Sequence, residues 1–382
     1  MRIAILGTRG VPANYGGFET FAQELSILLA DRGHDIFVYS RSKQFSDPYS
    51  MCSFYRSVGK VSTISLPTIF HKYLETIVHS CLSFIDCGLG DVDVIILCNA
   101  ANSIWIPIAK IKGIPVIVNV DGIERKRSKW NVFGRAWYLL GEVFSVIFAD
   151  IVVADAKVIE DYYRKTYSKS SEVIAYGADR IFKPAGQALE EFNLVPKNYI
   201  LYVSRLEPEN NALCVIQAYI KSDINKPLVI VGDAPYANEY KQKLYSQAAE
   251  LSQENPERRI IFAGFRFGDA YREFREHCYL YVQATQVGGT HPALVEAMMH
   301  ANCVVANNVP EHVEVLEDAG LYYAYNDADN LALILNKLGS NPELTTILGN
   351  KAYELAKSKY SWANIAQRYE ELCDSLCLAN RI

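Results

Sequence analysis

The sequence predicts two α/β domains, each built on a mainly parallel β-sheet with helices on both faces. Short, continuous apolar runs rich in Val and Ile recur along the chain and alternate with helix-like segments. Runs of this kind are typical of strands that are buried on both faces. In addition, 382 residues are too many for one ordinary core and fit two domains of roughly 180–200 residues.

The first half of the chain carries six strand-like runs and one especially clear helix. The predicted strands are Ile3–Leu6, Ile36–Tyr39, Val94–Leu97, Val116–Val120, Ile151–Ala154 and Val173–Ala175. After the first run, Phe18, Phe21, Leu25, Leu28 and Leu29 share one helical face, and Gly33 supplies a stop. Alternation of strands and helices predicts a doubly wound sheet.

The same alternation restarts near Tyr199, after a loop that contains Pro184, Gly186 and Pro196. The predicted strands of this second half are Ile200–Ser204, Leu228–Val231, Ile260–Ala263, Leu280–Ala284 and Val304–Ala306. We therefore predict one domain over 1–180 and a second over 181–358. A last helix, within 359–382, is expected to pack back toward the first domain. The two doubly wound domains are expected to face each other across a cleft.

Composition narrows the class of protein. Half of the residues are hydrophobic and 21% are charged, as in a globular protein, and the net charge of −5 gives no reason to expect nucleic acid as a partner. Nine cysteines occur without a CxxC pair, which favours packing thiols in a reduced, cytoplasmic protein over disulfides or a zinc site. The most apolar stretch, 137–153, contains Glu142 and Asp150, so we expect no membrane-spanning helix there.

The segment from Gly288 to Met298 is the most informative part of the chain. Gly288 and Gly289 precede Thr290 and His291, and Pro292 then opens a helix. A helix N-terminus offers unpaired N–H groups to an anion, and glycines let a diphosphate approach the backbone. Glu296, about one turn into the helix, can accept hydrogen bonds from sugar or ribose hydroxyls. Together these residues suggest a nucleotide-sugar site.

A long loop, Gly7 to Glu19, follows the first predicted strand. Its glycines, among them Gly16 and Gly17, and its helix N-terminus can meet phosphate, and Arg9, Asn14 and Tyr15 add polar groups. The loop lacks the glycine spacing of a dinucleotide site. A structural turn with a glycine at positive φ remains the alternative, although the loop is longer than usual for such a connection.

Asp121 and Glu124 follow another strand end. A carboxylate just past a buried strand is costly unless it is used, and Asp121 is placed to orient or deprotonate an acceptor hydroxyl. An Asp-Gly turn explains the same two residues equally well. The basic and aromatic segment 125–138 is either a solvated helix face or a contact with an anionic membrane surface.

Arg205 follows the first strand of the second half and is suited to clamp a diphosphate. The alternative is a surface ion pair with Glu207 or Glu209. Gly232-Asp233 and Gly264-Phe265-Arg266 also end strands, and either line a base pocket or form tight turns.

These segments, in this order, resemble retaining glycosyltransferases of the GT-B fold, family 4. The segment GTRGVPANYGGFET is similar to that family's acceptor-side loop, SRLEPENN to its diphosphate-binding turn, and GGTHPALVEAMMHANCVVANNVPEHVEVL to its donor-binding segment. VIAYGADRIFKP is similar to its crossover between domains and YSWANIAQRYEEL to its final helix. GTRGVPANYGGFETF, NVDGIERKRSKW, RLEPENN and GGTHPALVEAM also resemble a bacterial subgroup that includes rhamnosyltransferases of surface-polysaccharide assembly.

The resemblance assigns roles to matching residues. Glu296 matches the second glutamate of the family's E-x7-E motif, which holds the ribose. Arg205 matches the arginine on the donor diphosphate, and Gly16 and Gly17 match the glycines near the phosphates and acceptor. Two positions depart from the pattern: the first motif glutamate falls on Gly288, and the lysine usually paired with the arginine falls on Asn210. Thr290 and His291 are candidates for the sugar contact, and Arg9 and Arg266 for the missing positive charge.

The resemblance implies a hexosyltransferase-type enzyme that moves a sugar, rhamnose among the candidates, from a nucleotide diphosphate donor with retention. The expected donor is dTDP- or UDP-linked rather than GDP-linked, with no cofactor and no metal. The acceptor is a glycan or a saccharide on polyprenyl diphosphate, and the protein is expected in the cytoplasm or peripherally on the inner face of the membrane. The expected catalytic residues are Asp121, Arg205 and Glu296. A nucleotide-sugar epimerase or hydrolase, or a non-catalytic transferase-like subunit, remains the alternative, whereas a dinucleotide-dependent enzyme is disfavoured.

Overall fold

The computed structural model describes residues 1–13, 17–42, 53–55, 60–69, 74–120, 122–126, 131–234, 237–254, 258–286 and 289–379. Several predicted site residues lie outside this part of the chain, namely Asn14, Tyr15, Gly16, Asp121 and Gly288. The chain divides into two compact units. The first consists of Met1–Tyr176 with Trp362–Ile382, and the second of Gly177–Ser361.

The first unit contains, in its described residues, an eight-stranded sheet in the order β3-β4-β2-β1-β5-β6-β7-β8. All neighbours are parallel except β3, which is antiparallel to β4. Its strands are β1 (Arg2–Leu6), β2 (Asp35–Ser42), β3 (Ser53–Tyr55), β4 (Lys60–Pro67), β5 (Val94–Cys98), β6 (Val116–Asn119), β7 (Ile151–Ala154) and β8 (Glu172–Val173). Its helices are α1 (Gly17–Asp31), α2 (Leu74–Leu89), α3 (Ile106–Ile111), α4 (Val132–Phe148), α5 (Lys157–Tyr167) and α14 (Trp362–Ala379), with short 3-10 turns η1 (Ala100–Trp105) and η2 (Glu124–Lys126).

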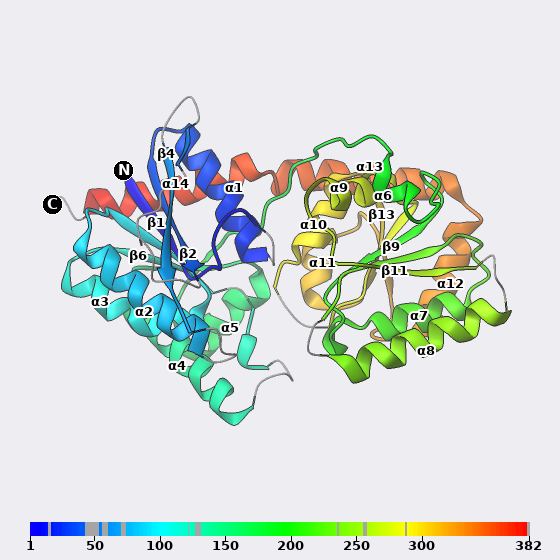
Figure 1. Ribbon diagram of the computed structural model, residues 1–382, viewed down its shortest axis with the longest axis horizontal. Helices are drawn as coiled ribbons and strands as arrows, with labels where there is room; N and C mark the ends of the chain where they lie inside the picture. Colours follow the sequence, from blue (N-terminus) through cyan, green and yellow to red (C-terminus); the bar gives the residue numbers. More distant parts are fainter. Residues whose placement is uncertain are drawn as a thin grey trace. The chain divides into compact units, whose positions relative to one another are not determined.

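Alternate residues of the first strand face opposite layers of helices. Ile3 and Ile5 share a core with α1 and α14, whereas Ala4 and Leu6 share another with residues from α2, α3 and α5. Figure 1 shows the helices of this unit on both sides of its sheet. This is the period of two that a strand imposes on its side chains. Helix α14 packs on α1, where the rings of Phe21 and Tyr369 lie 5.2 Å apart between centroids.

The second unit contains, where it is described, a six-stranded sheet in the order β11-β10-β9-β12-β13-β14 with only parallel neighbours. Its strands are β9 (Ile200–Val203), β10 (Leu228–Val231), β11 (Ile260–Gly264), β12 (Leu280–Gln283), β13 (Cys303–Asn307) and β14 (Leu321–Tyr323). Its helices are α6 (Gln187–Glu190), α7 (Ala212–Lys221), α8 (Asn238–Glu254), α9 (Gly268–His277), α10 (Pro292–Met299), α11 (Pro310–Leu316), α12 (Ala328–Gly339) and α13 (Pro342–Lys359), with the turn η3 (Pro208–Asn210).

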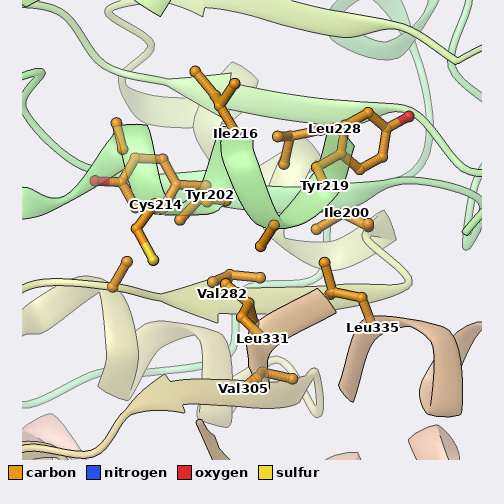
Figure 2. Close-up of a cluster of buried hydrophobic side chains, with 14 of the residues drawn as sticks. Ile200, Tyr202, Cys214, Ile216, Tyr219, Leu228, Val282, Val305, Leu331 and Leu335 are labelled. Carbon is orange, nitrogen blue, oxygen red and sulfur yellow. The ribbon is translucent and has the colours of Figure 1, made fainter. Parts of the chain in front are cut away.

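One face of this second sheet is closed by α7 and α12. Figure 2 shows Ile200, Val282 and Val305 from three neighbouring strands against side chains of these two helices, such as Ile216 and Leu335. Tyr202 and Tyr219 are fully buried here, and their hydroxyls donate to the carbonyls of Asn210 and Lys226. The hydroxyls of these two core tyrosines are therefore satisfied.

All the predicted strands are present, some with shifted ends. Strand β8 spans Glu172–Val173 instead of Val173–Ala175. Three strands were not predicted: β3, β4 and β14. In β4, buried Ser62 and Thr63 interrupt the apolar run, and β14 is a three-residue strand with two tyrosines. Predicted helix α1 is present, with Phe21, Leu25 and Leu29 buried, and Gly33 follows it at a φ of 94°.

Candidate functional site

The N-terminus of α10 lies at the end of the segment that follows β12, a central strand of the second sheet. As predicted, Pro292 is the first helical residue, and His291 is the N-cap with an extended backbone. Pro at this position costs no hydrogen bond, because the first N–H groups of a helix have no partner within it. Thr290 is buried and His291 is half-buried. The turn 289–291 therefore brings backbone amides and two polar side chains to the carboxyl edge of the sheet, where doubly wound proteins bind ligands.

Glu296 lies in the second turn of α10, with 18% of its side chain exposed. Its Oε2 forms an ion pair with Nη1 of Arg275 at 2.7 Å and accepts a hydrogen bond from the Tyr271 hydroxyl at 2.9 Å. Arg275 and Tyr271 lie one turn apart on α9, and the Arg275 guanidinium lies 4.2 Å from the centroid of the Tyr271 ring. Neither Arg275 nor Tyr271 was predicted as a site residue from the sequence.

A buried polar chain lies beneath the turn that precedes α10. The Tyr281 hydroxyl donates to Oε1 of Gln283 at 2.7 Å, and Nε2 of Gln283 donates to Oγ1 of Thr285 at 2.7 Å. The same hydroxyl lies 2.9 Å from Nε2 of His312 and 3.0 Å from Nε2 of His291. All but His291 are buried.

The chemistry of these groups fixes the direction of each hydrogen bond. Nδ1 of His312 lies 2.9 Å from the carbonyl oxygen of Asn307, so Nδ1 must carry the proton and Nε2 accepts. Thr285 therefore donates its one hydroxyl proton to His312. It accepts from Gln283 and from His291, which must hold a proton on Nε2. Burial lowers the pKa of His312 to about 4, although the Asn307 carbonyl opposes this, so the ring is neutral near pH 7.

Arg205 follows β9 and has 39% of its side chain exposed. It forms an ion pair with Glu207 at 3.7 Å, which is the alternative that the sequence left open. An exposed pair at this distance contributes little, so the guanidinium keeps most of its capacity to bind an anion. Asn210 is buried, and its Nδ2 donates to the carbonyl of Arg205 at 2.8 Å. The residue in the place of the expected lysine therefore holds the turn that carries Arg205.

Arg266 is committed to contacts within its own unit. Its two terminal nitrogens bind both carboxylate oxygens of Glu191, at 2.9 and 2.5 Å, and its Nε donates to the Ala263 carbonyl. A phosphate role for Arg266 would require this bidentate pair to open. Gly232 has a φ of 127°, and a Cβ there would lie 1.9 Å from the Ser204 carbonyl oxygen. Its glycine is thus explained by the turn.

In the first unit, the backbone conformation and close packing of the loop after β1 explain two of its described glycines. Gly7 and Gly10 have φ values of 90° and 112°, and added Cβ atoms would lie 2.2 Å from the Cys98 carbonyl oxygen and 2.0 Å from Ser40 Oγ. The predicted phosphate role therefore does not explain these two positions, and Gly17 is the first residue of α1.

Arg9 lies in this loop and is 38% exposed. Its Nη2 lies 3.5 Å from Oε2 of Glu75, whose Oε1 forms an ion pair with Arg41 at 2.9 Å. One carboxylate thus serves two guanidinium groups. Glu19, which accepts the backbone N–H of Arg9 at 2.9 Å, brings a second carboxylate to this loop.

The segment after β6 contains Glu124, the first residue of η2. The neighbouring Arg125 points into its own unit, because its Nε lies 3.1 Å from both oxygens of buried Glu142. The hydroxyls of Tyr162 and Tyr167 each donate to Glu142 at 2.9 Å. Glu142 is therefore a core carboxylate with three donors, and Arg125 is its counter-ion.

Helix α4 exposes a largely apolar face. Val132 and Phe133 are 80% and 83% exposed, and Leu139, Leu140 and Ile147 are also exposed. Arg125, Arg135 and Leu139 are among the residues that line a hollow of about 460 Å³ beside this face. Basic and apolar side chains thus occur together within the predicted segment 125–138, of which 127–130 lies outside the described residues.

Among the described residues, no three His, Cys, Asp or Glu side chains gather closely enough to hold a metal ion. No helix in this described part of the chain is both long enough and apolar enough to cross a membrane. Cys87, Cys278, Cys303 and Cys373 are buried thiols outside any disulfide, as expected of packing cysteines.

Comparison with known families divides the chain in two. Residues 1–179 match the model described as "Domain of unknown function (DUF1972)", and residues 189–355 match "Glycosyl transferases group 1". Over 187 residues the chain is 30% identical to lipopolysaccharide 1,2-N-acetylglucosaminetransferase of Salmonella typhimurium, covering 45% of this chain and 47% of that protein. It is 25% identical over 197 residues to the serotype-specific mannosyltransferase WbdA of Escherichia coli, covering 51% and 23%. The chain thus spans about half, or less, of the length of these relatives.

Solved structures resemble the whole chain. Sucrose-phosphate synthase from Thermosynechococcus elongatus has a TM-score of 0.81 at 18% identity, and covers 99% of both chains. Anabaena HepE in complex with UDP-glucose has a TM-score of 0.75 at 17% identity, and covers 98% of this chain and all of that one. These similarities confirm the predicted fold class, two Rossmann-like α/β domains of the GT-B type. The Salmonella and Escherichia coli relatives are named as glycosyltransferases, and residues 189–355, within the second unit, match the group 1 glycosyl transferase model.

Proposed function

We propose that this protein transfers a hexosyl group from a nucleotide diphosphate donor to a saccharide acceptor, with retention at the anomeric carbon, in surface-polysaccharide biosynthesis. One observation carries the proposal. In the region that matches the group 1 glycosyl transferase model, the N-terminal end of α10 and a carboxylate, Glu296, held by Arg275 and Tyr271, lie on one helix. The first group suits a diphosphate and the second suits the hydroxyls of its nucleoside.

The second unit supplies the groups that stabilise the leaving diphosphate in this proposal. The backbone N–H groups of Gly289 and Ala293, together with the positive end of the α10 dipole, bind its oxygens, and Arg205 adds a full positive charge. As the bond between the anomeric carbon and the phosphate oxygen breaks, negative charge grows on the diphosphate. These donors stabilise the transition state because they are already in place. The acceptor oxygen then bonds to the anomeric carbon on the same face, and its proton passes to the departing phosphate oxygen.

The first unit supplies the acceptor side in the proposal. Arg9, whose side chain is 38% exposed, would attract an anionic part of the acceptor. Glu124, and Asp121 beyond the described residues, would orient the attacking hydroxyl. The relatives named as lipopolysaccharide and serotype-specific transferases support an acceptor in a surface glycan, either a free saccharide or one on polyprenyl diphosphate.

In more detail, we propose a dTDP- or UDP-linked donor, with rhamnose among the candidate sugars. The transfer would need no metal or cofactor. The UDP-glucose complex of the structurally similar HepE supports a pyrimidine nucleotide. The exposed apolar face of α4, with Arg135 beside it, supports peripheral contact with the inner face of the membrane. Such contact would bring the protein to a lipid-linked acceptor.

The test is a panel of UDP-, dTDP- and GDP-sugars offered with lipid-linked and soluble acceptors. We expect nucleotide release and a product heavier by one hexosyl or deoxyhexosyl residue with one pyrimidine donor. Free sugar or an epimer formed without acceptor would identify a hydrolase or epimerase instead. Nucleotide binding without any turnover in this panel would favour a non-catalytic subunit.

A further inference from the structure

His291, at the start of α10, has a ring whose charge can change near neutral pH. Its Nε2 lies 3.0 Å from Oγ1 of Thr285, and Thr285 gives its own proton to His312, so Nε2 of His291 holds a proton in every charge state. The ring therefore gains or loses a proton only at Nδ1. A proton added there creates an imidazolium and leaves the hydrogen bond to Thr285 intact.

The other three histidines of the second unit are set apart by burial or by position. Burial lowers the pKa of His312 to about 4, so this ring stays neutral near pH 7. His300 follows the last turn of α10, and burial lowers its pKa as well. His277 ends α9 at the amino edge of the sheet, where its Nε2 donates to the Lys183 carbonyl at 2.8 Å. His291 is the half-buried ring at the carboxyl edge.

The proposed diphosphate site draws positive charge from Arg205. Arg266 is bound on two nitrogens by Glu191, and Asn210, which holds the carbonyl of Arg205, brings no charge. A sugar nucleotide carries a negative charge on each of its phosphates. A second cation beside the start of α10 would therefore match the charge of the ligand.

An anion close to an imidazole favours the protonated form of the ring. The His291 ring is attached to the N-cap of α10, and the backbone N–H groups of Gly289 and Ala293 lie on either side of this residue in the chain. We propose that His291 takes up a proton at Nδ1 when the donor binds, and that the resulting imidazolium stabilises the diphosphate together with Arg205. The proton comes from the solvent, and the Nε2 proton stays in its bond to Thr285. This inference rests on the proposed function, because it assumes that the donor diphosphate lies at the start of α10.

Other charged side chains also belong to the elements around this edge of the sheet. They come from the turn after β9 (Arg205, Glu207 and Glu209), from α9 (Arg275), from α10 (Glu296) and from α11 (Glu311 and Glu314). These charges are present before and after binding, so they set the pH at which the ring titrates. The direction of the change comes from the diphosphate, which adds negative charge and so strengthens the binding of the proton.

Calorimetry in two buffers measures this proton directly. UDP-glucose and dTDP-glucose are suitable ligands, because their phosphates are diesters that take up no proton themselves near neutral pH. Each is titrated into the full chain in HEPES and in Tris, whose ionisation enthalpies differ, at a series of pH values from about 6 to about 8. The difference in binding enthalpy, divided by the difference between the buffers, gives the number of protons taken up.

We expect about half a proton per ligand at the pH of greatest uptake, which is the amount for an anion that favours imidazolium over imidazole about tenfold. Because binding takes up a proton, the Kd should also fall as the pH falls from about 8 to about 6, by about sixfold in all. Measurable binding with the same enthalpy in both buffers throughout this range would refute the inference.

Two variants assign the proton to its residue. His291→Gln keeps an amide that can donate to Thr285 but binds no proton, so it should lose both the proton uptake and the pH dependence of the Kd. His277→Gln keeps a donor for the Lys183 carbonyl at the opposite edge of the sheet, and it should retain both. Undiminished proton uptake in His291→Gln would overturn the role given to His291.

The proposed function fails in a different way. If neither ligand binds, the other sugar nucleotides of the donor panel replace them, since their phosphates are diesters too. A protein that binds none of them has no donor site at the start of α10, and both the function and the inference are wrong. Binding without proton uptake leaves the donor site in place and refutes the inference alone.

Discussion

Removing the hydroxyl of Thr285 should destabilise the second unit by about 3 kcal/mol. Thr285→Val preserves volume, so it creates almost no cavity, but it deletes one donor and two acceptor positions. The amide of Gln283 and Nε2 of His312 then lose their partner at places that water does not reach, since these residues are 3% and 0% exposed. Each such buried group costs about 1–3 kcal/mol. The half-buried His291 can turn to solvent and adds little.

The chain provides a convenient way to observe each unit separately. Its four tryptophans, Trp105, Trp130, Trp137 and Trp362, all belong to the first unit. In urea, tryptophan fluorescence therefore reports the unfolding of that unit, whereas far-UV circular dichroism reports both. Thr285→Val should shift the dichroism transition and leave the fluorescence transition in place.

Thr285→Ser is the matched control, because it keeps the hydroxyl and loses one methyl group, at about 1 kcal/mol. If the valine variant proves as stable as the serine variant, or more stable, the hydrogen-bond directions assigned around Thr285 are wrong. A shift of the tryptophan transition by Thr285→Val would also contradict the reasoning, since Thr285 lies in the second unit.

Three further predictions concern other groups. Glu142→Ala should destabilise the first unit by about 3 kcal/mol, because the three donors around this carboxylate lose their acceptor. An unfolding transition by tryptophan fluorescence like that of the native protein would contradict this. The pKa of His312 is about 4 in the folded state and about 6.5 in the unfolded state. Stability is therefore lost as the pH falls between these two values, by about 3 kcal/mol in all. His312→Asn should flatten this slope in dichroism melts, and an equally steep slope would exclude His312 as its source. Arg205→Ala should lower kcat/KM for transfer about a hundredfold, whereas Arg259→Ala, an exposed arginine of the same unit, should not; equal rates in both would remove Arg205 from the site.

The repeating apolar runs were sufficient to predict the fold. Strands β1, β5, β9, β10 and β12 are buried on both faces, so their sequences are almost wholly apolar and easy to recognise. Strand β4 was missed because Ser62 and Thr63 are buried in it, and an apolar pattern cannot detect a strand with polar residues in its core. The start of α10 was predictable, because Pro292 is a local signal.

The partners of the site residues could not be predicted, because they depend on contacts between elements distant in the sequence. Nothing near Glu296 indicates that Arg275 and Tyr271 would meet its Oε2, and the charged sequence of α9 reads like a solvated helix. Arg266 looked available for phosphate, yet Glu191, 75 residues away, binds it on both oxygens. Asn210 appeared to be a missing cation, whereas it holds the carbonyl of Arg205.

The first unit is assembled from two separated pieces of chain, and this affects the order in which the protein can fold during synthesis. Trp362, Ile365, Tyr369 and Cys373 of α14 belong to the same core as Ile3 and Phe21. A ribosome therefore completes all of the second unit before it delivers the helix that closes the first. Until then, the α1 face lacks its cover and exposes apolar side chains that invite aggregation or chaperone binding. Substitutions that weaken the packing of α14 should consequently lower the yield of folded protein in the cell, because they leave the α1 face of the first unit uncovered.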